Sequence, residues 1–502
     1  MAIILGIDLG TQSVKATLTD TETGLLTSAG REYSVEIPHP GYAQEDPEVW
    51  WQSVVGILSA LRLAQPEAFA AISGIGLTGQ MHGLVSLDTS LQPAYPAIVW
   101  LDQRSAAQVA QIYASQNHAY LAEHLQNRIF PGYALPSLLW LYEELPETYS
   151  RIAHVVCPKD YIRLRLTGEL GSEPTDASGT CLYDLRSGTW FRPLLESLGL
   201  DAGLLPELGQ PMQTAGTVTA SCADETGLRA GIPVIYGASD ESALLLGNGL
   251  VSEGNVVANI GTGATVSVYS DADRYDPELR THTFCNAVDG SCAVFGAILG
   301  GGINMRWVRD SILDGMDYEA LSELAASAPS GSDGLIFLPY TSGERTPHMD
   351  PQATGMLFGL RLIHDRRYLV RAVMEGICFA MRDCLQILAE LGLPAEGVIA
   401  SGGGARSAVW MQIMADILNQ EVRISTTPEQ ACLGISILAA AALGFYADVR
   451  EGCRALVRFA PEGYTPDPVN AALYEELHGI YGELYRASSD LMHRVSSRGD
   501  LD

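Results

Sequence analysis

The chain has 502 residues, which is too many for one hydrophobic core and predicts two to four domains. It carries 59 acidic and 30 basic residues and a formal net charge of -29. Because no general basic field exists to attract phosphate, we expect neither nucleic acid nor an anionic membrane as a partner. An anionic substrate would need a local site or a metal ion to overcome this charge.

Cysteine usage and the apolar runs point to a reducing compartment and to no membrane span. The nine cysteines are scattered without a Cys-x-x-Cys pair, as is typical of buried free thiols. The N-terminal MAIILGIDLG lacks the basic segment and cleavage site of a secretory signal. The run at 431–447 is shorter than the roughly 20 residues of a membrane span and favours a tightly packed internal helix. We therefore expect a cytoplasmic protein.

The first elements in chain order are a β-hairpin and a helix. Residues 2–20 consist of an apolar strand and an alternating strand, so the bend falls at Gly10–Ser13. Residues 45–64 are expected to be helical, because Asp46 can cap the first turn and Pro47 suits the first helical position. Residues 72–88 predict two strands joined at a glycine-flanked bend.

Strands and helices alternate up to about residue 245, which predicts an α/β domain. The last stretch of this part, IYGASDESALLLG at 235–247, predicts a strand ending at Ile235 and a helix beginning near Glu241. It places two adjacent carboxylates, Asp240 and Glu241, at the helix start. A helix cap is the simplest interpretation of these carboxylates when the stretch is taken alone.

A second strand–bend–strand pattern occupies residues 254–270 and echoes residues 2–19. The echo predicts a duplicated domain with a cleft between the copies, and we divide the chain into domains 1–246 and 247–502. Residues 366–392 predict a long helix, and the segment beginning at Gly397 predicts a strand, a glycine loop and a helix.

The two glycine-threonine bends are candidate phosphate-binding loops. Backbone N–H groups at a tight turn can surround phosphate oxygens, and Thr11 and Thr262 can add hydroxyl donors. Asp8 lies three residues before Thr11, and a carboxylate near phosphate suits Mg²⁺. A third loop, SGGGARS at 401–407, is neither a Walker A loop nor a dinucleotide fingerprint. Taken alone, each glycine-threonine bend is more typical of an ordinary hairpin turn, and the third loop is also compatible with a tight strand-to-helix turn.

Together these loops resemble a known superfamily. GIDLGTQSVK, NIGTGA and SGGGARS, in this order, resemble the two phosphate loops and the adenosine loop of actin-like ATPases. The chain further resembles the FGGY carbohydrate kinases from about residue 2 to about 485, through GYAQEDPEVWW, GLTGQMHGLV, VCPKDYIRLRLTGE, YTSGERTPHMDPQATGMLFGL and RAVMEGICFAMRD. GQMHG and SGERTPH resemble the branch of that family that phosphorylates D-xylulose. The fold so implied is α/β, with two actin-like (ribonuclease H-like) ATPase domains and a cleft between them.

The resemblance implies transfer of the γ-phosphoryl group of ATP to O5 of D-xylulose, with Mg²⁺ as the metal. Asp240 matches the family's catalytic base, for which an ordinary carboxylate pKa would suffice, and Asp8 would hold Mg²⁺. Lys15 either reaches a phosphate or lies on the strand surface. The residues implied to bind ATP are Gly10, Thr11, Gln12, Lys15, Gly261, Thr262 and Gly263 at the phosphates, and Gly402, Gly403, Gly404 and Arg406 at the adenosine.

On the sugar side the resemblance implies Met81 and His82, with Trp100 stacking on a carbon face and Asp102 accepting from hydroxyls. It also implies a homodimer. The sequence departs from the family at Glu241, where asparagine is usual, and at Ser137, where lysine is usual. The first departure leaves open another pentulose, a polyol or a sugar acid as substrate. A more remote alternative is an actin-like ATP-binding protein, a chaperone or filament subunit, without a sugar pocket.

Overall fold

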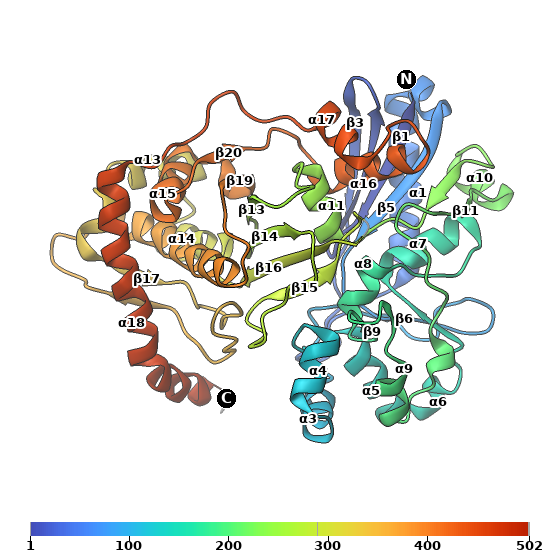
Figure 1. Cartoon of the computed structure of the whole chain (residues 1–502), viewed down its shortest axis with the longest axis horizontal. Coiled ribbons are helices and arrows are strands. Elements are labelled where there is room, and N and C mark those ends of the chain that lie inside the picture. Colours follow the sequence, from blue (N-terminus) through green and yellow to red (C-terminus); the bar gives the residue numbers. More distant parts are fainter. Residues whose placement is uncertain (1, 289, 500–502) are drawn as a thin grey trace. The chain divides into compact units, whose positions relative to one another are not determined.

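Two six-stranded mixed sheets organise the chain in the computed structural model, which describes residues 2–288 and 290–499 (Figure 1). Internal contacts divide the chain into two units: the first sheet lies in unit 1, and the second lies in unit 2 except for the end of β15 and the start of β16. Unit 1 comprises Met1–Val251, Phe284–Ala293 and Thr427–Val457, and unit 2 comprises Ser252–Thr283, Val294–Thr426 and Arg458–Asp502.

The sheet of unit 1 is built around the predicted hairpin. Strand β1 pairs with β2 in the antiparallel sense and with β5 in the parallel sense. Gly10 N donates to Ser13 O over 2.9 Å and closes the bend where the sequence predicts it. The strand order is β11 (Thr214–Thr217), β12 (Pro233–Ile235), β5 (Ile72–Gly79), β1 (Ile3–Leu9), β2 (Ser13–Asp20) and β3 (Gly24–Glu32).

Helix α16 (Gln430–Ala442) covers glycines of this sheet although it comes from late in the chain (Figure 1). A Cβ atom on Gly6 of β1 would lie 2.5 Å from the carbonyl oxygen of Cys432. On its other side, α16 packs against α11 (Asp240–Gly247) just as closely, because a Cβ on Gly434 would lie 1.9 Å from Ala243 O. The buried helix expected from the apolar run at 431–447 is thereby confirmed.

The remaining helices and small sheets of unit 1 flank these layers. Helix α1 (Pro47–Ala64) begins as predicted, with Asp46 Oδ1 accepting from Glu48 N over 2.9 Å. The other helices are α2 (Pro66–Ala70), α3 (Ala106–Ser115), α4 (His118–Leu125), α5 (Ala134–Glu144), α6 (Pro146–Tyr149), α7 (Pro158–Thr167), α8 (Pro174–Ala177), α9 (Arg192–Ser197), α10 (Ala220–Thr226) and α17 (Val449–Leu456). Two-stranded sheets pair β4 (Gln44–Glu45) with β7 (Ala97–Ile98), β6 (Val85–Leu87) with β8 (His154–Val156), and β9 (Tyr183–Asp184) with β10 (Thr189–Trp190).

The sheet of unit 2 repeats the arrangement around the first hairpin. Strand β13 pairs antiparallel with β14 and parallel with β19, as β1 pairs with β2 and β5. The repeat places Asn259 of β13 at the position that Asp8 occupies on β1. The strand order is β15 (His282–Cys285), β16 (Cys292–Ile298), β14 (Ala264–Ser270), β13 (Asn255–Ile260), β19 (Gly397–Gly402) and β20 (Val422–Ile424).

Helices of unit 2 include the long one predicted for residues 366–392. It is α14 (Arg366–Glu390), and buried side chains line it over most of its length. The others are α12 (Gly302–Trp307), α13 (Tyr318–Ala326), α15 (Ala408–Leu418) and α18 (Pro468–Gly499), and β17 (Ile336–Leu338) pairs with β18 (Met356–Phe358).

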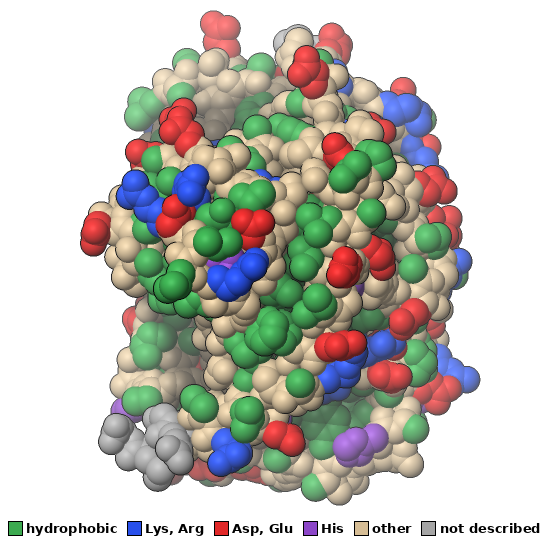
Figure 2. Space-filling model, turned by 90° about the vertical axis from the view of Figure 1, so that its left-hand side faces the viewer, with side chains coloured by type: hydrophobic (Ala, Val, Ile, Leu, Met, Phe, Trp, Pro, Cys, Tyr) green, Lys and Arg blue, Asp and Glu red, His purple; other side chains and the backbone are tan. Residues whose placement is uncertain are grey.

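The cysteines, the charged surface side chains and the apolar helices are three features for which the composition gave an expectation. All nine cysteines are free, and seven of them are buried. On the face drawn in Figure 2, acidic and basic side chains are interspersed with apolar ones. None of the described helices combines the length and the apolar composition that crossing a lipid bilayer requires.

Candidate active site

Asp240 is the first residue of helix α11, after a turn that follows strand β12. Ser239 is the N-cap, and Asp240 Oδ1 accepts from Glu241 N over 2.9 Å, so the predicted strand–turn–helix is confirmed. Burial raises the pKa of Asp240 well above its usual range, and the charges of Asp8 and Glu241 raise it further. The carboxylate that was matched from the sequence to the family's base therefore has a pKa above that of an ordinary aspartate.

Asp8 lies near the end of β1, directly opposite Lys15 of β2. Asp8 is half-buried. Burial of its carboxylate raises its pKa to about 6, although the positive charge of Lys15 lowers that pKa in part. Lys15 Nζ forms an ion pair of 2.8 Å with Glu429 Oε2, just before helix α16. Nothing in the sequence singled out Glu429, because its partner is more than four hundred positions away along the chain.

The first phosphate loop, Gly10–Gln12, is held from two sides. The Tyr33 hydroxyl donates to Gly10 O. The indole Nε1 of Trp100 donates to Thr11 Oγ1 over 2.9 Å. Trp100, proposed for the sugar side, therefore lies against this loop, so that one side chain connects two predicted parts of the site.

The Met81-His82 bend follows β5 and is strained at His82, whose φ is 74°. His82 Nδ1 lies 2.7 Å from Gly179 O, so in the neutral ring Nδ1 carries the proton and Nε2 is an acceptor. The ring stacks on Tyr133 with a centroid distance of 4.1 Å and an interplanar angle of 6°. Met81 is buried beside it. These contacts fix the imidazole in one orientation.

Asp102 is fully buried and both its oxygens have protein partners. Oδ2 accepts from Ala43 N over 2.6 Å and from Arg104 Nε over 2.8 Å, while Oδ1 accepts from Arg104 N. A sugar hydroxyl would have to displace one of these contacts. Ser137, where the family usually has lysine, is also fully buried, on α5.

In unit 2, the second phosphate loop, Gly261–Gly263, is bound to the start of α12. Gly302 N donates to Gly261 O and Ile303 N donates to Thr262 O, each over 2.9 Å. A Cβ on Gly301 would lie 2.2 Å from the carbonyl carbon of Gly263, so only glycine allows this approach. Residues 300–302 were not identified from the sequence as part of the site, although three consecutive glycines were visible there.

Glu344, within the SGERTPH motif, fixes the chain that leads into this glycine run. Its Oε1 accepts from Leu299 N over 2.9 Å and from Arg345 N over 2.8 Å. The residue is buried, and burial raises its pKa to about 8. The motif that the sequence linked to sugar choice therefore contacts the segment that packs on the second phosphate loop.

The third loop, Gly402–Gly404, lies beside the second because β19 pairs with β13. Gly402 has a φ of 81°, and a Cβ on it would lie 2.5 Å from Asn259 Oδ1. Arg406 follows the loop and is exposed. Unit 2 thus places the two glycine loops next to each other, while unit 1 brings together Asp8, Lys15, Asp240 and the first loop.

Comparison with known proteins identifies the family. The model of the N-terminal domain of the FGGY family of carbohydrate kinases matches residues 3–247, and that of the C-terminal domain matches residues 256–443. The "Xylulose kinase" of Lactococcus lactis is 34% identical over 502 residues, which are 100% of each chain.

Two solved structures extend this likeness. One, a "xyloylose kinase" from Brucella ovis, has a TM-score of 0.91 at 34% identity and covers 97% of this chain and 100% of its own. The other, a gluconate kinase from Lactobacillus acidophilus, has a TM-score of 0.91 at 28% identity and covers 97% and 98%. The chain therefore has the two-domain actin-like ATPase fold and belongs to the FGGY family of carbohydrate kinases, which are phosphotransferases.

Proposed function

We propose that the protein transfers the γ-phosphoryl group of ATP to O5 of D-xylulose, giving D-xylulose 5-phosphate and ADP. The observation that carries the proposal is Asp240 at the start of α11, close enough to Asp8 for the Asp8 charge to raise its pKa. Carboxylates whose pKa is shifted by burial and by a nearby charge are common at catalytic sites. The names of the full-length relatives support the choice of sugar.

In this proposal Asp240 is the general base. It takes the proton from O5 while O5 bonds to the γ-phosphorus, and the bond from that phosphorus to the β–γ bridging oxygen breaks to release ADP. The reaction needs the ionised carboxylate, which burial and the charges of Asp8 and Glu241 disfavour. A carboxylate with a raised pKa is correspondingly a better proton acceptor once it is ionised.

Asp8 is the proposed ligand of Mg²⁺, directly or through water. Its donor chemistry fits, because hard Mg²⁺ prefers carboxylate oxygen, and a nearby cation would favour the ionised form of a carboxylate whose pKa is about 6. The bound ion would supply charge neutralisation at the phosphates. Lys15, which is held by Glu429 opposite Asp8, adds a fixed positive charge on the same strand pair.

The nucleotide is assigned to the three glycine loops. We expect the amides of Gly10–Gln12 and Gly261–Gly263 to contact phosphate oxygens, and Gly402–Gly404 with Arg406 to border the adenosine. The support in unit 2 is the binding of the second loop to α12 and the close packing of the third loop on β13.

A panel of acceptors in an ADP-release assay tests the substrate. We expect D-xylulose to give the highest kcat/KM among D-xylulose, D-ribulose, L-ribulose, L-xylulose and gluconate. D-Xylulose is favoured because two full-length relatives, from Lactococcus lactis and Bacillus subtilis, are named xylulose kinase. A better signal from another sugar, with none from D-xylulose, would change the substrate and leave the reaction class intact.

His82 is expected to govern the affinity for sugar. We expect His82→Asn to raise the KM for D-xylulose by about 10-fold or more, since one unpaired hydroxyl costs roughly 1–3 kcal/mol. Asparagine is chosen because it tolerates the positive φ of this position. The KM for ATP should not change. An unaltered KM for D-xylulose would remove His82 from the sugar site.

A further inference from the structure

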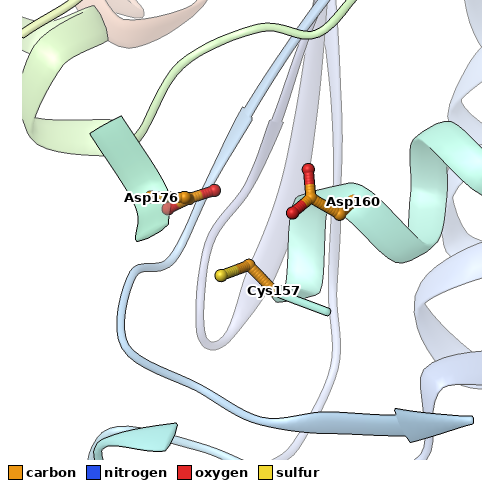
Figure 3. Close-up of side chains that lie close together, drawn as sticks. All are labelled: Cys157, Asp160 and Asp176. Carbon is orange, nitrogen blue, oxygen red and sulfur yellow. The ribbon is translucent and has the colours of Figure 1, made fainter. Parts of the chain in front are cut away.

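A buried charge cluster lies outside the proposed catalytic groups of unit 1. Three buried side chains point toward one another: Asp160 of α7, Cys157 just before α7, and Asp176 of α8 (Figure 3). Their spacing would suit a metal ion, but the cluster already contains a cation. The ammonium of Lys159 lies 3.0 Å from Asp160 Oδ1 and 3.0 Å from Asp176 Oδ2.

Lys159 also lies 3.0 Å from Glu173 Oε1, so that one ammonium serves three carboxylates. All four side chains are completely shielded from solvent. Burial disfavours the Lys159 ammonium, but the three carboxylates outweigh it and hold its pKa well above the usual range. Removing one partner from such a cluster is costly, so Glu173 is held firmly in place.

Glu173 in turn orients the hydroxyl of Thr175. Thr175 Oγ1 donates to Glu173 Oε1 over 2.9 Å, and Thr175 N donates to Glu173 Oε2 over 2.7 Å. Because the hydroxyl proton is donated to Glu173, Thr175 Oγ1 can act only as an acceptor toward other groups. It accepts from the backbone N–H of Ser239 over 2.7 Å. Ser239 caps α11 immediately before Asp240.

The same segment contacts the candidate sugar-binding bend. Gly179 O is the acceptor for His82 Nδ1 at 2.7 Å. A Cβ on Gly179 would lie 2.8 Å from Met81 Cε and 3.0 Å from His82 Nδ1. Residues 173–180 therefore touch the start of α11 through Thr175 and the His82 ring through Gly179.

We propose that residues 173–180, fixed by Lys159, are a positioning segment that sets the places of Asp240 and His82. This inference rests on the proposed function, in which Asp240 is the base and His82 binds sugar. Thr175 and Gly179 touch neither substrate in this account. They act through Ser239 and through His82, and a displacement of about 1 Å at a reacting group can cost on the order of 100-fold in rate.

Two substitutions should separate the two arms of the segment. Thr175→Val keeps the shape of the side chain but removes the acceptor for Ser239 N, and we expect kcat to fall about 10-fold or more with little change in either KM. Gly179→Ala crowds Met81 and His82, and we expect the KM for D-xylulose to rise about 10-fold with the KM for ATP unchanged. Thr175→Ser retains the hydroxyl and should restore most of kcat.

Thr226→Val is the matched control in unit 1. Thr226 is also buried, and its Oγ1 accepts from Leu228 N over 3.2 Å, so that variant loses a comparable hydrogen bond at the end of α10. It should lower the Tm without changing kcat or KM. A purely structural segment would give the same result for Thr175→Val and Gly179→Ala.

The decisive measurement is whether Thr175→Val changes kcat and Gly179→Ala changes the KM for D-xylulose, with Asp240→Asn assayed in parallel. If Asp240→Asn is inactive but Thr175→Val keeps kcat within about 2-fold of wild type, the positioning role fails while the proposed function stands. If Asp240→Asn turns over normally, Asp240 is not the base, and the inference that residues 173–180 position it is overturned as well. Should Thr175→Val not fold, an unchanged KM for D-xylulose in Gly179→Ala would by itself overturn the inference.

Discussion

Replacing Asp240 by asparagine is expected to lower kcat for sugar phosphorylation by about 10²- to 10⁴-fold, the usual contribution of a positioned general base. Asparagine keeps an oxygen that can accept from Glu241 N, so the start of α11 should persist. Binding of ATP, measured by calorimetry, should be retained, because the glycine loops are not altered. The loss should therefore appear in kcat and not in the KM for ATP.

Asp20→Asn provides the control for this substitution. Asp20 is a buried carboxylate of the same unit, and its Oδ1 also accepts from a backbone N–H two residues later. That variant removes the same charge away from the proposed site and should keep kcat within about 2-fold of wild type. Near-normal turnover in Asp240→Asn, with Asp20→Asn also active, would exclude Asp240 as the base.

Replacing Glu344 by glutamine is expected to remove a large pH dependence of stability. The Glu344 pKa rises from 4.5 to about 8 on folding, so the folded state holds a proton that the unfolded chain releases between these values. The free energy of unfolding therefore falls as the pH rises from 4.5 to about 8 and then levels off. The total loss from this group is up to roughly 5 kcal/mol. Glutamine still offers an oxygen to Leu299 N and Arg345 N.

The test compares the Tm of wild type and Glu344→Gln at pH 5 and at pH 9. The difference should shift in favour of the variant at pH 9, by several degrees. Glu319→Gln, an exposed carboxylate at the start of α13 in the same unit, serves as the control and should show no such shift. Equal differences at both pH values in Glu344→Gln would mean that Glu344 ionises in the folded protein as it does in the unfolded chain.

Local patterns were enough to predict much of the fold. The bend at Gly10, the cap at Asp46 and the start of α11 each depend on a few neighbouring residues, and all three were predicted. The repeat of the first hairpin in unit 2 was visible as a short echo, and strand pairing shows it fully. Membership of a carbohydrate kinase family also removes the alternative of a chaperone or filament protein.

Contacts between distant residues could not be read from the sequence. The raised pKa of Asp240 depends on burial and on Asp8, and neither is encoded near position 240. The hydrogen bond from Trp100 to Thr11 likewise joins two motifs that the sequence assigned to different substrates. The motifs and their resemblance to the family identified the candidates, whereas the partners of these residues required the folded chain.

Helix α16 also determines when unit 1 can complete its folding during synthesis. It packs on the first sheet, yet it is synthesised only after all six strands of the second sheet. At about 5–20 residues per second, a ribosome needs roughly 10 to 40 seconds to proceed from Val251 to the end of α16. During that time Gly6 and Gly76 lack the helix that covers them. We therefore expect unit 1 to complete its folding late in translation, with its first half in need of protection from aggregation until then.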